Sequence, residues 1–175
     1  VQTCALPIYL TLYWDESQGK ELFEKEQIKI GQILKPWTYT EGDREIEQVV
    51  VDELIQQKKT VAVAESCTGG LVVQRLTRIP GASNVVWGGY TAYQMAAKEK
   101  MLGVKIANSE EAVSQSCSNQ LATRAKNQSG CDLIGAVTGY MGPSASEKDP
   151  IGTVYLSVLG KKLVERKVVI PTQDR

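Results

Sequence analysis

Residues 60–70, TVAVAESCTGG, constrain the fold of this chain more than any other stretch. The first half is a short apolar run rich in valine, which is typical of a buried β-strand. A helix follows, because apolar side chains recur at helical spacing from Leu71 to Ile79, and Pro80 then ends the pattern. Two glycines form the turn between strand and helix. Such a unit is typical of α/β folds, in which helices alternate with parallel strands.

The rest of the chain continues this alternation. Apolar spacing predicts helices over residues 20–34, 95–102 and 110–127. Asp43 is the expected N-cap of a further helix, whose apolar face is Ile46, Val49, Val50, Leu54 and Ile55. Strand composition is found over residues 9–13, 82–93, 131–137, 152–159 and 163–170. The last two form a hairpin, and Gly88-Gly89 predicts a bulge or a close backbone approach. We therefore expect a three-layer α/β/α sandwich, with a mostly parallel sheet and an antiparallel hairpin at its edge.

Three regions are expected along the chain. Residues 1–8 match a translation of a widely used sequencing adapter, so we expect them to be non-native, with a genuine short β-segment as the alternative. Residues 9–42 hold one strand, one helix and a linker, too little to bury their own apolar faces. Residues 43–175 form the main domain.

The absence of histidine limits the chemistry that this sequence can perform. With no histidine among 175 residues, a Ser-His-Asp triad, a Cys-His pair and histidine-based metal sites are excluded within the chain. Four scattered cysteines form no CxxC pair, which argues against a disulfide framework and a zinc site. Acid–base work must therefore be done by Lys, Tyr, Asp, Glu or Cys.

Charge and hydropathy favour a small-molecule ligand. Twenty basic and twenty acidic residues balance, with no basic block, so neither nucleic acid nor an anionic membrane is expected as a partner. No apolar run approaches the roughly 18 residues that span a bilayer, and no signal peptide is visible. A cytoplasmic location is the expectation from sequence.

Ser66 stands at the end of the predicted central strand, before the turn. A hydroxyl there faces backbone N–H groups at a helix N-terminus, which can bind an oxyanion or a phosphate. The alternative is structural, with Thr68 as a simple helix cap and the glycines closing the turn. Cys67 is a second possible nucleophile, but a free cysteine is more often a small buried apolar residue.

Two further strand ends, at residues 138–143 and 90–98, are expected to lie at the same edge of the sheet. With histidine excluded, Lys98 is the best available base for Ser66, with Tyr93 as a proton relay. A lysine acts as a base near neutral pH only when burial or a neighbouring cation lowers its pKa. The alternative is a solvated surface lysine at the start of a helix.

At this point the sequence resembles a known family, the C-terminal domain of CinA proteins, also called the nicotinamide-nucleotide amidase or PncC family. The matching segments are VAVAESCTGG (61–70), IPGAS (79–83), Gly88-Gly89 with Tyr93 and Lys98, LGV (102–104), AVS (112–114), Thr138-Gly139 with Gly142-Pro143, and PIGTVY (150–155). They occur in the family order and cover about residues 43–175. Residues 9–42 also resemble the stretch before this domain in full-length CinA proteins, which implies a further upstream domain.

The resemblance implies hydrolysis of nicotinamide mononucleotide to nicotinic acid mononucleotide and ammonia, with no metal and no cofactor. It places the nucleophile on Ser66, the base on Lys98 and the assisting tyrosine on Tyr93. Other family positions fall on Ser114, Thr138 and Gly139, for substrate contact or site structure, and on Arg175, for the nucleotide phosphate. We take the backbone of Thr68, Gly69 and Gly70 as the candidate oxyanion donors. The partner is then a small nucleotide, and a homo-oligomer is left open.

Several positions depart from the family pattern. Tyr140 and Met141 replace part of a glycine-rich segment, residues 144–146 (SAS) stand where glycines are usual, and Glu111 also replaces a glycine. The chain ends at Arg175, before the final helix expected in the family. These changes leave an alternative open, a catalytically inactive nucleotide-binding or regulatory module of the same fold.

Overall fold

The structure, a computed structural model, describes residues 10–13, 15, 17, 19–109, 111–143 and 145–170. The helices are α1 (Lys20–Leu34), α2 (Ile46–Gln57), α3 (Leu71–Thr77), α4 (Met95–Leu102) and α5 (Gln115–Ser129), with a short 3₁₀ turn, η2, at Ala82–Asn84. The strands are β1 (Val61–Glu65), β2 (Val86–Thr91), β3 (Leu133–Gly139), β4 (Thr153–Leu159) and β5 (Leu163–Val169). Residues 1–8 lie outside the described residues, so their expected origin stays a prediction.

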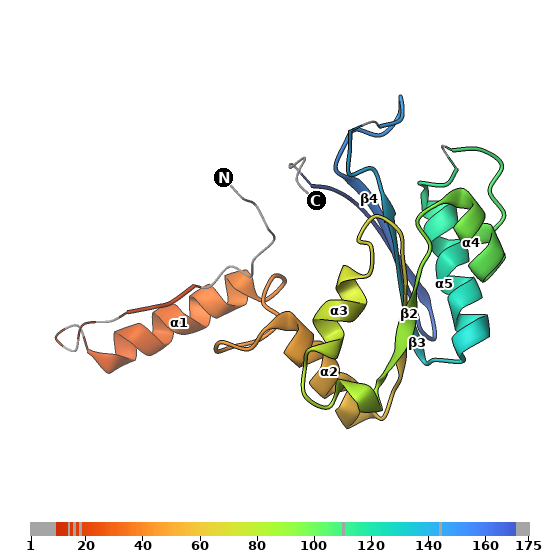
Figure 1. Cartoon of the computed structure of the whole chain (residues 1–175). Helices are drawn as coiled ribbons and strands as arrows, with labels where there is room; N and C mark the ends of the chain where they lie inside the picture. Colours follow the sequence, from red (N-terminus) through yellow and green to blue (C-terminus); the bar gives the residue numbers. More distant parts are fainter. Residues whose placement is uncertain are drawn as a thin grey trace.

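The five strands form one mixed sheet in the order β2-β1-β3-β4-β5. Strand β1 is parallel to both β2 and β3, while β4 pairs antiparallel with β3 and with β5. Figure 1 shows α2 and α3 on one side of this sheet and α4 and α5 on the other. The predicted three-layer sandwich with an antiparallel edge hairpin is therefore confirmed.

Strand β1 is buried along its whole length and divides the core into two clusters. Ala62 and Ala64 face one cluster, which α4 and α5 complete with side chains such as Leu121. Val61 and Val63 face the other cluster, which α2 and α3 complete. Because successive side chains of a strand point to opposite faces, the residues that follow Ala64 alternate between the same two layers.

The glycine pair in β2 has the role predicted for it. The register between β1 and β2 shifts by one residue, from Val61 opposite Val86 to Ala62 opposite Gly88. A Cβ atom at Gly89 would lie 2.5 Å from Val73 Cγ2, which is too close for a real side chain. Glycine at this position therefore lets α3 pack directly on β2.

Three local predictions are wrong. Residues 10–13 adopt no strand. Helix α5 begins at Gln115, not at residue 110, because Ser114 caps it by accepting a hydrogen bond from the backbone of Cys117. Helix α2 begins at Ile46 with Glu45 as N-cap, so Asp43 is not the cap.

The buried face of α2 also differs from the expected apolar face. Val51 and Leu54 are buried, but Ile46, Val50 and Ile55 are 38–43% exposed. The third buried residue of the helix is the acidic Glu47, which pairs with Arg75 of α3. The buried face of α2 thus includes an ion pair to α3, where the apolar pattern predicted isoleucine and valine side chains.

Helix α1 lies apart from the sheet. It has the predicted bounds, it buries none of its residues, and Figure 1 shows it projecting away from α2. Among the helices of the described residues, none has the length and apolar character needed to cross a bilayer.

Candidate active site

Strand β1 ends by sending two polar side chains into opposite layers of the sandwich. Glu65 follows Val61 and Val63 toward α3, whereas Ser66 follows Ala62 and Ala64 toward α4 and α5. Ser66 is only 5% exposed, and its backbone N–H donates to the carbonyl of Val137 on β3. The candidate nucleophile is therefore fixed at the carboxyl end of the central strand, where α/β folds bind their ligands.

Lys98 reaches Ser66 from the α4 side. Its Nζ lies 3.0 Å from Ser66 Oγ, and the two groups share a hydrogen bond across 32 residues of sequence. The same Nζ donates to the backbone carbonyl of Tyr93, also at 3.0 Å. Lys98 is 2% exposed, so it is not a solvated surface lysine, and the alternative interpretation of this residue is wrong.

The surroundings of Lys98 favour a neutral amine. Burial lowers the pKa of Lys98, and only the nearby thiols of Cys117 and Cys67 act in the opposite direction. Among the described residues, no carboxylate forms an ion pair with it. A lysine whose protonated form is disfavoured and whose nitrogen contacts a serine hydroxyl is suited to accept the proton of that hydroxyl.

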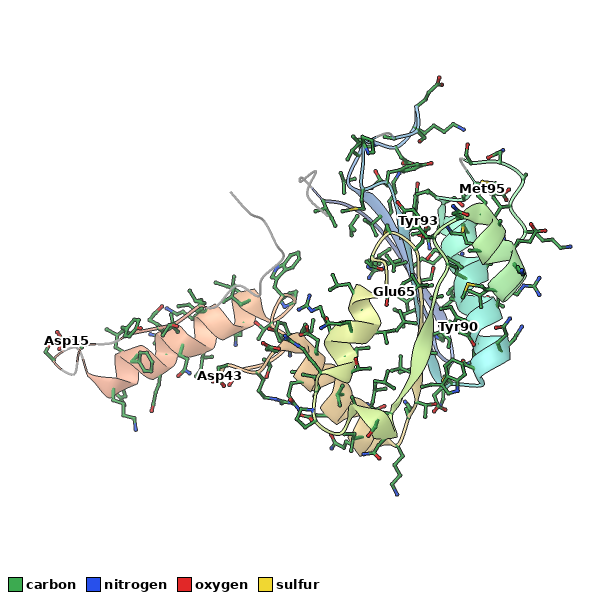
Figure 2. The ribbon with its side chains drawn as sticks, viewed as in Figure 1. Asp15, Asp43, Glu65, Tyr90, Tyr93 and Met95 are labelled. Atoms are coloured by element: carbon green, nitrogen blue, oxygen red, sulfur yellow. The ribbon has the colours of Figure 1, made fainter. Side chains whose placement is uncertain are left out.

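Tyr93 contributes to this contact through its backbone and not through its phenol. Its side chain is 55% exposed, and Figure 2 shows it near the start of α4, close to Met95. Among the described residues, the phenol shares no hydrogen bond with Ser66 or Lys98. A proton relay through the Tyr93 side chain thus stays a prediction.

The turn after Ser66 is closed by Glu65, a residue that sequence reasoning missed. The Glu65 carboxylate accepts hydrogen bonds from the backbone N–H groups of Gly70, Val72 and Val73, at 2.9–3.0 Å. Gly70 is the N-cap residue, with a positive φ of 104°, and no side chain at the cap position supplies a bond. The structural alternative, in which Thr68 caps α3, is therefore wrong. The hint for Glu65 in the sequence was an acidic residue in an otherwise apolar strand.

The Glu65 cap occupies one of the backbone N–H groups that were expected to bind the oxyanion. The N–H of Gly70 is bound to Glu65, and the N–H of Gly69 donates to the carbonyl of Ser66 at 3.1 Å. Neither glycine N–H is free for a ligand, so their expected role is not supported. Thr68 differs, because its Oγ1 is buried and has no hydrogen-bond partner among the described residues. The hydroxyl is thus an additional candidate donor, and the predicted role of the Thr68 backbone N–H stays a prediction.

Cys67 does not have the properties of a reactive thiol. Burial raises its pKa above the ordinary value, and the charge of Glu65 acts in the same direction. The backbone N–H groups of Cys67 and Thr68 and the charge of Lys98 only partly offset this. A thiol that stays protonated is a poor nucleophile.

The structure gives three other predicted residues structural contacts. Ser114 caps α5 and donates to the carbonyl of Glu111 at 2.8 Å. Thr138 is fully buried and donates to the carbonyl of Ala112 at 3.1 Å, which fastens the loop before α5 to β3. A Cβ atom at Gly139 would lie 2.7 Å from the carbonyl oxygen of Thr153. Their expected contact with substrate stays a prediction, and Arg175 lies outside the described residues.

The loop between β3 and β4 is tied down at its far end. Asp149 accepts hydrogen bonds from Tyr155 Oη at 2.8 Å and from Lys167 Nζ at 2.7 Å. The Lys167 hydrogen bond is the main cause that lowers the pKa of Asp149, followed by that of Tyr155. Tyr140 and Met141, the departures from the family pattern, are half-buried at the start of this loop.

A surface groove formed by the described residues lies away from Ser66. It has a volume of about 560 Å³ and lies over α5, lined by Gln115, Ser116, Asn119, Gln120, Thr123, Arg124 and Glu165. None of these is a predicted site residue. Within the described ranges, no group of three or more cysteine or acidic side chains is arranged to hold a metal ion.

Comparison with known proteins supports a single family. The family model described as the CinA C-terminal domain matches residues 43–175. A CinA-like protein of Syntrophotalea carbinolica is 36% identical over 154 residues, which are 86% of this chain and 37% of that protein. The chain thus spans less than two fifths of the length of such curated relatives.

Solved structures of similar sequence have the same fold. The competence/damage inducible protein CihA from Agrobacterium tumefaciens is 33% identical with a TM-score of 0.66, over 70% of this chain and 78% of that chain. A CinA superfamily protein from Escherichia coli is 28% identical with a TM-score of 0.68, over 72% and 76% of the two chains.

Proposed function

This chain belongs to the CinA C-terminal domain family, and from that premise we propose that it is an amidohydrolase acting on nicotinamide mononucleotide. The products are nicotinic acid mononucleotide and ammonia, which would make it an enzyme of pyridine nucleotide recycling. The observation that carries the proposal is the 3.0 Å contact between Lys98 Nζ and Ser66 Oγ, both buried at the end of β1. A serine in contact with a lysine whose pKa is lowered by burial can act as a nucleophile with its base.

The first half of the proposed reaction forms an acyl-enzyme. Neutral Lys98 takes the proton of Ser66, and the alkoxide attacks the carboxamide carbon of the substrate. The carbonyl oxygen becomes an oxyanion, for which the backbone N–H and the unpartnered hydroxyl of Thr68 are the candidate donors. Protonated Lys98 then passes its proton to the amide nitrogen, the C–N bond breaks, and ammonia leaves.

The second half restores the enzyme. Lys98, neutral again, takes a proton from a water molecule that attacks the ester carbon. The tetrahedral intermediate collapses, the C–O bond to Ser66 breaks, and the serine regains its proton from Lys98. The nucleotide is released as a carboxylic acid. Since each half begins with neutral Lys98, the burial that lowers the pKa of Lys98 supports both.

A second candidate is a nucleotide-binding or regulatory module of the same fold without catalysis. The observation that favours it is the low exposure of Ser66, 5%, together with the half-buried Tyr140 and Met141 in place of part of the family's glycine-rich segment. Such a module would retain ligand binding without ammonia release. The contact between Ser66 and Lys98 favours the enzyme, because binding alone does not require a base beside a serine.

Ammonia release from nicotinamide mononucleotide tests the proposal. The full-length protein would be compared with Ser66→Ala and Lys98→Ala, and with Lys126→Ala as a matched control. Lys126 bonds to the backbone carbonyls of Cys131 and Asp132, at the opposite end of the sheet. We expect release by the wild type and the control and none by the two site variants. Folded wild-type protein without ammonia release, or equal rates in all four proteins, would refute the enzyme proposal.

A further inference from the structure

Glu65 is a buried acidic residue directly before the proposed nucleophile. It is 1% exposed, and both of its carboxylate oxygens accept hydrogen bonds. Oε2 accepts from the N–H groups of Gly70 and Val72, each at 3.0 Å, and Oε1 accepts from the N–H of Val73 at 2.9 Å. All three donors belong to the first turn of α3 or to its N-cap. Glu65 therefore supplies the hydrogen bonds that the start of this helix lacks in its own sequence.

These bonds hold the serine turn from both sides. On one side, β1 is paired along its length with β2 and β3, and the N–H of Ser66 continues this pairing by donating to Val137. On the other side, α3 is attached to the last residue of β1 through the Glu65 carboxylate. Only residues 66–69 lie between the two attachments. The path of the turn is thus fixed at both ends by the strand that carries Ser66.

The alternation of β1 makes this attachment independent of the catalytic face. Glu65 points to the α3 layer, and Figure 2 shows it beside the upper end of α3. Ser66 points to the opposite layer, where Lys98 lies 3.0 Å away. Glu65 therefore cannot act on the substrate itself, but it determines where the neighbouring serine is held.

We infer that Glu65 is a positioning residue, whose carboxylate anchors the first turn of α3 so that Ser66 stays in contact with Lys98. The inference rests on the proposed amidase function for its kinetic part. Without the carboxylate, three partly buried N–H groups lose their acceptor and the turn relaxes. A displacement of the nucleophile by about 1 Å is enough to slow a positioned reaction by about 10²-fold.

Glu65→Gln and Glu47→Gln form a matched pair of variants for the test. Glu47 is similarly buried, at 4% exposure, and it also supports α3, but through the side chain of Arg75 and not through the serine turn. In Glu65→Gln the new side-chain amide presents an NH₂ group to one or more of the three N–H donors, so the anchor fails without a change in side-chain size. We expect Glu65→Gln to lower kcat at least about tenfold with little change in KM, and Glu47→Gln to leave both unchanged.

Two readouts do not depend on the proposed substrate. Amide hydrogen exchange over residues 66–73 should accelerate in Glu65→Gln and stay slow in Glu47→Gln. The rate at which a fluorophosphonate labels Ser66 should fall in Glu65→Gln and stay at the wild-type value in Glu47→Gln. If the wild type is labelled at Ser66 but releases no ammonia, the proposed function is wrong, and the labelling and exchange rates still test the role of Glu65. If the wild type neither labels nor releases ammonia, exchange alone decides.

Equal kcat, labelling and exchange in the two variants would overturn the inference. So would a raised KM with unchanged kcat in Glu65→Gln, since that pattern indicates a substrate contact. If Glu65→Gln does not fold, Glu65→Asp replaces it, because aspartate keeps the charge but is one methylene too short to reach all three donors. The inference then requires Glu65→Asp to show lower kcat and faster exchange, and wild-type values would refute it.

Discussion

The two faces of β1 hold buried ionisable groups of opposite kinds. On the α3 face, Glu65 is 1% exposed and accepts three backbone N–H bonds. On the α4 face, Lys98 is 2% exposed and contacts two uncharged oxygens, Ser66 Oγ and the carbonyl of Tyr93. Both groups are removed from water, but only the carboxylate is anchored by three backbone N–H donors.

This difference separates a structural role from a chemical one. A carboxylate that accepts three backbone N–H bonds at the start of a helix holds those groups in a fixed geometry, because each of its oxygens has its own donors. A lysine without a carboxylate partner is driven toward its neutral form, because burial costs the ammonium more than the amine. Glu65 is therefore suited to hold the backbone in place, and Lys98 to exchange protons.

Lys98→Met should have the largest effect, and it tests the chemical role of the buried group on the α4 face of β1. Methionine fills a similar volume without an ionisable group, so ammonia release should fall by about 10³-fold or more. The free energy of unfolding should change little, because removal of a buried amine without an ionic partner offsets the loss of its hydrogen bonds to Ser66 Oγ and to the carbonyl of Tyr93. Steady-state kinetics and urea unfolding measure the two effects. Retained activity, or a large loss of stability, would contradict the assignment.

The pH dependence should have the next largest effect. Because neutral Lys98 is the active form, kcat/KM should rise about tenfold per pH unit until the pH passes the pKa of Lys98, which lies below its ordinary value of 10.5. The unfolded chain binds a proton at Lys98 between this lowered pKa and 10.5, so stability should rise with pH in that window. Lys98→Met should lose this part of the stability profile. A flat rate profile over the same range would argue against lysine as the base.

Glu47→Gln should have a moderate effect on stability and none on catalysis. Glu47 is 4% exposed and pairs with Arg75, and Arg78 lies 3.7 Å away. Burial raises the pKa of Glu47, but the hydrogen bond and charge of Arg75 outweigh it and lower the pKa overall. Losing the charge should cost about 1 kcal/mol in the free energy of unfolding. Denaturant unfolding measures this, and a parallel loss of kcat would show that the α3 layer as a whole supports the site.

Cys67→Ala should have the smallest effect and sharpens the choice of nucleophile. Burial raises the pKa of Cys67, so its thiol stays protonated and takes no part in the proposed reaction. We expect kcat to stay within about threefold of the wild type, since the change removes only one small side chain. Ammonia release by Cys67→Ala beside Ser66→Ala is the measurement. A loss as large as that of Ser66→Ala would reassign the nucleophile.

Periodic patterns allowed much of the fold to be predicted. The bounds of α1 and α4 were predicted to the residue, and the β4–β5 hairpin to within one residue at each end. The N-cap residues were harder to predict from the sequence. The first residue of α2 and of α5 depends on which residue precedes the first free N–H groups of the helix. Asp43 was the expected cap of α2, but the chain enters that helix at Glu45. A polar residue before an apolar run does not determine which turn becomes the first of the helix.

The candidate site was also predicted only in part from the sequence. The sequence by itself determined that Ser66 lies at the end of a buried strand, that Lys98 lies on the helix after the next strand and that no histidine is available, because strand and helix periodicity and composition are local properties. Only the tertiary structure decided that the buried Lys98 contacts both Ser66 Oγ and the backbone carbonyl of Tyr93. It also decided that the Glu65 carboxylate binds backbone N–H groups at the start of α3. These contacts join separate layers of the sandwich, so they depend on how helices pack on the sheet and not on the spacing of residues along the chain.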